Sequence, residues 1–114
     1  MGEPRRWSGQ WRLDLVHDDA RLAITVPDLL GTLILKAAAA AADTREATRH
    51  ERDAAVLAAL ITDHATERAQ LHGSDRRRFT SLSSRLTDPF HPAWLALSDD
   101  LAVRCKDTLR ILIA

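Results

Sequence analysis

The sequence predicts a mainly α-helical domain that opens with a small β-hairpin, an α+β architecture. Two observations predict it. Apolar and polar residues alternate over 11–16 and again over 21–26, which is the period of a half-buried strand. From residue 27 onward the apolar residues recur every three or four positions, which is the period of an amphipathic helix. The length of 114 residues suits one domain.

The N-terminal part divides into two segments. Residues 1–10 show no periodicity, and we expect a loose lead-in. The hairpin then covers 11–26, with Asp18 and Asp19 in its turn, and opens a single domain over 11–114. Its buried side is predicted to carry Trp11, Leu13, Leu15, Leu22, Ile24 and Val26.

A two-stranded hairpin exposes two edges and is only marginally stable by itself. Only helices follow it in this chain. Either those helices cover one face of the hairpin, or its edge pairs with a sheet from another polypeptide. That polypeptide would be a separate protein or a second copy of the chain.

The helical region, 27–114, is predicted to hold four longer helices and two short ones. Pro27 suits a first helical turn, and Ser74 and Ser98 suit N-caps. The expected segments are 27–42, 48–62, 65–71, 75–86, a short piece from 93, and a last helix to about 112. The apolar stripes of the two last long helices are Phe79, Leu82 and Leu86, and Leu101, Cys105, Thr108 and Leu112.

Composition excludes several classes of protein. The formal net charge is zero, so the overall charge does not indicate a nucleic-acid or membrane partner. The lone Cys105 excludes an internal disulfide and fits a reducing compartment. No apolar stretch approaches the roughly 18 residues of a membrane span. We therefore expect a cytoplasmic protein with no membrane contact.

Two charged residues occupy positions where a helical protein normally buries carbon. Lys36 follows an apolar run and shares a helix face with Leu29 and Leu33. Asp53 similarly shares a face with Leu57 and with the residues at 60 and 61. A buried charge is costly unless it is paired or binds a ligand, so this pair requires an explanation.

Two interpretations of the pair are open and compatible. Lys36 and Asp53 lie on consecutive antiparallel helices, so they can form a structural ion pair, which Arg49 joins at i, i+4 to Asp53. Alternatively, Lys36 binds an anionic ligand such as a phosphate while Asp53 orients the ammonium group. An ammonium is a compact point charge suited to phosphate.

Four segments in order resemble the C-terminal part of AbiEii-type nucleotidyltransferase-like toxin proteins, of the actinobacterial kind. They are residues 26–37, 49–57, 73–78 and 91–94, and the likeness extends over roughly 20–112. The resemblance implies the helical C-terminal region of a nucleotidyltransferase-like fold. It also implies that Lys36 faces the nucleotide triphosphate, with Asp53 and Arg49 completing the pocket wall.

The resemblance is incomplete at the metal site. Such proteins carry an upstream Asp-x-Asp strand that binds two magnesium ions, which neutralise the triphosphate. This chain has no Asp-x-Asp, and Asp14 is a single strand carboxylate. Magnesium and a nucleotide triphosphate are therefore implied by the resemblance alone, and we assign no catalytic or metal-binding residue. The sequence does not decide whether the chain is an enzyme.

The densest basic cluster is Arg76, Arg77 and Arg78 at a helix start, and it is the best candidate contact for nucleic acid, such as an acceptor RNA. Three consecutive helical positions spread around the helix, however, which favours an ordinary solvated surface. The five histidines never take the i, i+4 spacing of a helical metal site. His50 merits a test because it neighbours Arg49.

Two functions are thus predicted. In the first, the chain is a truncated nucleotidyltransferase-like protein that supplies the helical wall of a nucleotide pocket and is inactive alone. Its partners would be a separate catalytic half, or a second copy through the hairpin edge, and an antitoxin. In the second, the chain is a small helical protein-interaction module in which Lys36 and Asp53 form a purely structural pair, and the 76–78 helix or the hairpin edge binds a partner.

Overall fold

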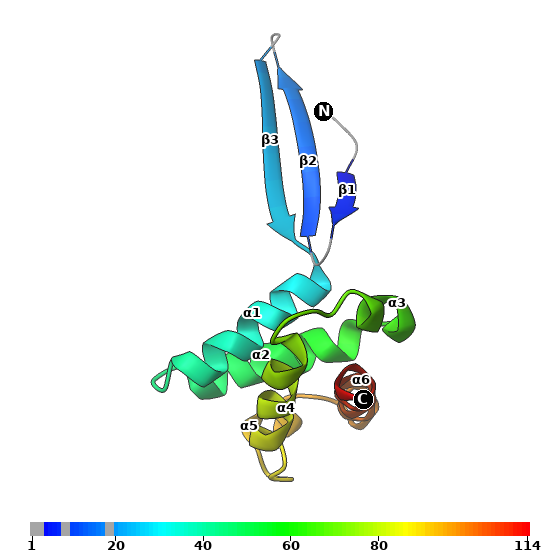
Figure 1. Cartoon of the computed structure of the whole chain (residues 1–114). Coiled ribbons are helices and arrows are strands. Elements are labelled where there is room, and N and C mark those ends of the chain that lie inside the picture. Colours follow the sequence, from blue (N-terminus) through cyan, green and yellow to red (C-terminus); the bar gives the residue numbers. More distant parts are fainter. Residues whose placement is uncertain (1–3, 8–9, 18–19) are drawn as a thin grey trace.

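The computed structural model describes residues 4–7, 10–17 and 20–114, with side chains from Pro27 onward. Its described part is mainly helical, as predicted (Figure 1). The strands are β1 (Pro4–Trp7), β2 (Gln10–His17) and β3 (Ala20–Pro27). The helices are α1 (Leu29–Ala42), α2 (Ala47–Leu60), α3 (His64–Ala69), α4 (Asp75–Arg85), α5 (Pro92–Leu95) and α6 (Asp99–Ile113).

The strands form an antiparallel sheet in the order β1-β2-β3. Leu15 pairs with Leu22, and the ladder extends to Gln10 opposite Pro27. β1 lies in the stretch that the sequence analysis treats as a loose lead-in, and it pairs with the other side of β2. The predicted turn at Asp18 and Asp19 and the predicted buried side of the hairpin lie outside the described residues and side chains. Figure 1 shows the sheet projecting from the helical body, which it meets at the start of α1.

The predicted start of the first helix is wrong by two residues. Pro27 ends β3, and α1 begins at Leu29. The reason is Asp28, whose carboxylate accepts a hydrogen bond from the Gly31 N–H at 2.8 Å. An aspartate in extended conformation satisfies a free amide of the first turn, and so sets the helix start.

The core lies among α1, α2, α4 and α6, with α2 in contact with α1, α5 and α6. α1 and α2 pack most extensively, and alanines dominate what they bury: Ala37 and Ala40 on α1, and Ala54, Ala55, Ala58 and Ala59 on α2. Small side chains let two helix backbones approach closely. α1 also buries two long side chains, Leu30 and Leu33.

The predicted apolar stripes are confirmed. Phe79, Leu82 and Leu86 are buried, and so are Cys105, Thr108 and Leu112, while Leu101 is partly buried. Ser98 caps α6, and its hydroxyl accepts from the Leu101 N–H. Ser74 precedes α4 without a side-chain cap. There the buried Asp75 carboxylate instead accepts from the His72 N–H at 3.1 Å, which ties the preceding turn to the helix.

Candidate functional site

Lys36 and Asp53 meet, as predicted, across the α1–α2 contact. The Lys36 ammonium donates to the Asp53 carboxylate at 2.9 Å. The expectation that both charges are buried is wrong, since their side chains are 30% and 44% exposed. A long lysine stem can pack against apolar neighbours while its ammonium group stays near the solvent. The pair therefore lies where a solute can reach it.

Arg49 does not join this pair. Among the described residues no ion pair links Arg49 to Asp53, although they lie at i and i+4. Both side chains instead line one open cavity of about 360 Å³, together with Arg52, Val56 and Ala96. Of the predicted site residues, Arg49 and Asp53 line this cavity, whereas Lys36 is not among its lining residues and reaches it only through Asp53. Arg52, which was not predicted, also lines it. The sequence feature that could have indicated Arg52 is its i, i+3 spacing from Arg49 on α2.

The net charge at this cavity depends on which of its charged side chains form ion pairs. Lys36 and Asp53 neutralise each other at 2.9 Å. Arg49 and Arg52 are exposed, and within the described part of the chain neither has a carboxylate at ion-pair distance. The two guanidinium groups therefore determine the sign, and the cavity is positive. Guanidinium groups match the geometry of phosphate and carboxylate oxygens.

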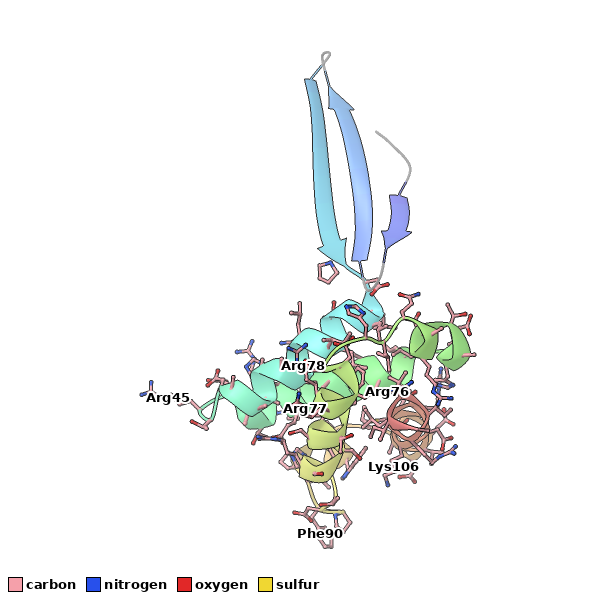
Figure 2. All side chains as sticks on the ribbon, in the orientation of Figure 1. Arg45, Arg76, Arg77, Arg78, Phe90 and Lys106 are labelled. Carbon is pink, nitrogen blue, oxygen red and sulfur yellow. The ribbon has the colours of Figure 1, made fainter. Side chains whose placement is uncertain are left out.

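A second link joins α1 and α2 near their connecting turn. The Asp43 carboxylate faces the His50 Nε2 at 3.4 Å and accepts from the N–H groups of Arg45 and Glu46. These contacts hold the pKa of Asp43 below its usual value, and the Glu46 N–H is the main cause. His50 Nδ1 is buried and has no hydrogen-bond partner among the described residues. Asp43 thus acts as a turn and capping residue, and Figure 2 shows Arg45 at the tip of this turn.

A buried polar cluster that was not predicted from the sequence lies on the opposite side of α2. The Glu51 carboxylate lies 2.5 Å from His91 Nε2 and 3.6 Å from Arg85 Nη1, and its side chain is only 8% exposed. His91 Nδ1 accepts the Ala93 N–H at 3.0 Å, so Nε2 carries the proton and donates it to Glu51. The sequence feature that could have indicated this cluster is Glu51, a charged residue on the alanine face of α2.

Arg76, Arg77 and Arg78 are all exposed but do not converge. They leave α4 in different directions (Figure 2). Arg78 is 3.5 Å from the Asp75 carboxylate, and Arg76 lines a small cavity with Leu71, His72 and Gly73. Consecutive helical residues are about 100° apart, so this arrangement is expected. The three do not present one cationic face.

Cys105 is buried, and His64 is held by a hydrogen bond within the fold. Burial raises the pKa of the Cys105 thiol to about 12, so the thiol stays protonated and unreactive. His64 Nε2 lies 2.8 Å from the fully buried Thr108 hydroxyl, which ties α3 to α6. The described residues hold no group of three side chains placed to bind a metal ion. None of their helices has the length and apolarity of a membrane span.

No family model, curated protein or solved structure matches the chain.

Proposed function

We propose that this chain supplies the phosphate-binding helical wall of a nucleotide pocket in a nucleotidyltransferase-like protein, and that these 114 residues do not supply its metal-binding acids. The observation that carries the proposal is the exposed Lys36–Asp53 ion pair beside a positive cavity. A purely structural pair requires no neighbouring unpaired cations. Here two such cations, Arg49 and Arg52, open on the same cavity.

The geometry suggests a division of roles. Arg49 and Arg52 attract the polyphosphate, and Val56 and Ala96 form an apolar wall beside them. Lys36 exchanges part of its contact with Asp53 for a phosphate oxygen, while Asp53 keeps the ammonium oriented. Both partners are partly exposed, so this exchange demands little desolvation. The chain binds the nucleotide without reacting it, because it provides no pair of metal-binding carboxylates of the Asp-x-Asp kind.

The binding test uses the four magnesium nucleoside triphosphates, each titrated into the protein and followed by calorimetry and by amide chemical shifts. We expect at least one to bind, with shifts centred on α1 and α2. Lys36→Ala and Arg49→Ala should each weaken binding by about tenfold or more, since each removes a charge-assisted contact. Arg104→Ala is the matched control, because Arg104 is an exposed arginine on α6 outside this cavity. Absence of binding for all four nucleotides would refute the proposal.

A second candidate function is a protein-interaction module. The observation that favours it is the sheet, in which β3 pairs with β2 on one side and forms an edge along eight residues. Such an edge can accept a strand from another chain. Here Lys36 and Asp53 would only join α1 to α2. Nucleotide binding that Lys36→Ala abolishes would favour the first function, whereas a partner captured along β3 without any nucleotide would favour the second.

A further inference from the structure

A second cavity, independent of the Lys36 site, lies between α4, α5 and α6. Its volume is about 500 Å³, within the range of small-molecule sites. The walls are largely apolar and come from Leu86, Leu109, Ile113 and the Trp94 ring. The Trp94 indole N–H donates to the Leu86 carbonyl at 3.1 Å, so the ring is fixed in place. A preformed apolar wall with a fixed aromatic ring suits a flat hydrophobic group.

The charge of this cavity selects among apolar ligands. Its lining includes two cationic side chains, Lys106 and Arg110, and no acidic one. The Lys106 ammonium lies 4.8 Å from the centre of the Trp94 ring, which holds the charge beside the apolar wall (Figure 2 labels Lys106). Within the described part of the chain no carboxylate lies at ion-pair distance from Lys106. Arg110 is 3.6 Å from Asp107, which leaves Lys106 as the available charge.

Polar groups complete the lining of the cavity. Ala114 lines one end, and its main-chain oxygen accepts from the Arg68 guanidinium at 2.6 Å. Hydroxyl groups of Ser83 and Thr87 complete the rim. The site therefore combines an apolar floor, one fixed aromatic ring and an ammonium group that has no carboxylate partner among the described side chains.

We infer that this cavity binds a small amphipathic organic anion, with its flat apolar group against Trp94 and its carboxylate on Lys106. The apolar wall matches the flat group of such a ligand, and the Lys106 ammonium matches its carboxylate. An apolar neutral molecule could not form the charge-assisted contact with Lys106, and a small inorganic anion would leave the apolar walls in contact with water. The inference does not depend on the proposed nucleotide site, because the two cavities share no residue.

The test varies the charge of the ligand and the charge of the side chain at position 106. The probes are 2-naphthoate, its neutral analogue 2-naphthalenemethanol, and 2-naphthylmethylammonium. Binding is followed by the NMR signal of the Trp94 indole N–H, which Trp94→Phe assigns among the three tryptophans of the chain. A Kd of about 1 mM or tighter is expected for naphthoate, given the size of the ligand. The neutral and cationic probes should bind at least fivefold more weakly.

Lys106→Met should weaken naphthoate binding by about five- to tenfold and leave the neutral probe unaffected, because methionine keeps the apolar stem and removes the charge. Arg104→Met is the matched control on α6 outside the cavity and should change neither Kd by more than twofold. Amide spectra of both variants verify the fold. Three results would each overturn the inference: no saturable shift with naphthoate, equal binding of the neutral probe, or unchanged naphthoate binding in Lys106→Met.

Discussion

Two carboxylates of α2 lie only two positions apart and have opposite surroundings. Glu51 is enclosed and contacts His91 and Arg85, whereas Asp53 is 44% exposed and contacts Lys36. Two residues along an α-helix correspond to about 200° of rotation, so the two side chains leave α2 on nearly opposite faces. The comparison teaches that burial, rather than the pairing itself, separates a carboxylate that holds the fold from one that remains available to a ligand.

The largest expected effect is at Glu51. Glu51→Ala should lower the free energy of unfolding by about 3 kcal/mol, because it leaves the buried His91 N–H without an acceptor. Denaturant unfolding followed by circular dichroism measures the change. Glu51→Gln is the control: its amide oxygen can still accept from His91, so it should lose less than the alanine variant. Equal stability of wild type and Glu51→Ala would show that this cluster does not hold α5 to α2.

At Lys36 we expect a much smaller effect on stability. Lys36→Met keeps most of the apolar stem and removes the ammonium, and the loss should be below about 1 kcal/mol because the ion pair is partly exposed. The same denaturant experiment tests it. A loss as large as that of Glu51→Ala would mean that the pair is structural, which would favour the interaction-module function.

Arg52 separates an effect on ligand binding from an effect on stability. Arg52→Ala should change the free energy of unfolding by less than about 0.5 kcal/mol, because the side chain is exposed and unpaired among the described residues. It should nevertheless weaken magnesium nucleotide binding severalfold in the calorimetric titration. If Arg52→Ala bound nucleotide as wild type does, the cavity on α2 would not be part of the site.

The smallest effect concerns acid pH at the α1–α2 turn. The pKa of Asp43 in the folded protein lies below its ordinary value of 3.8, mainly because the Glu46 N–H donates to it. Its stabilising contribution is therefore complete above that ordinary value and disappears as the pH falls through the lowered one. Asp43→Asn should be less stable than wild type at neutral pH, and the gap should close in strong acid. A gap independent of pH would contradict this role.

Much of the fold could be predicted from periodicity and capping, because those signals are local. The stripe Phe79, Leu82 and Leu86 repeats at helical spacing, and Ser98 caps the N-terminus of α6 as expected. The start of α1 was misjudged because Pro27 and Asp28 both suit a helix N-terminus, and the aspartate cap prevails. The local sequence pattern does not distinguish a helix that starts at Pro27 from one that is capped by Asp28.

The candidate site could be predicted only in part. The contact between Lys36 and Asp53 followed from antiparallel neighbouring helices, but their exposure did not, because it depends on how closely the alanines bring α1 and α2 together. The Glu51 cluster was missed since its partners, Arg85 and His91, lie more than thirty residues away in the chain. Such long-range contacts leave no periodic trace in a sequence.

One measurement tests the central claim most directly: unfolding of wild type, Glu51→Gln and Lys36→Met with and without a saturating magnesium nucleotide. A ligand that binds only the folded state raises stability by about 2.7 kcal/mol at a hundredfold excess over Kd. The account predicts that wild type and Glu51→Gln gain the same increment, whatever their starting stabilities, and that Lys36→Met gains almost none. An equal increment in Lys36→Met, or none in wild type, would contradict it.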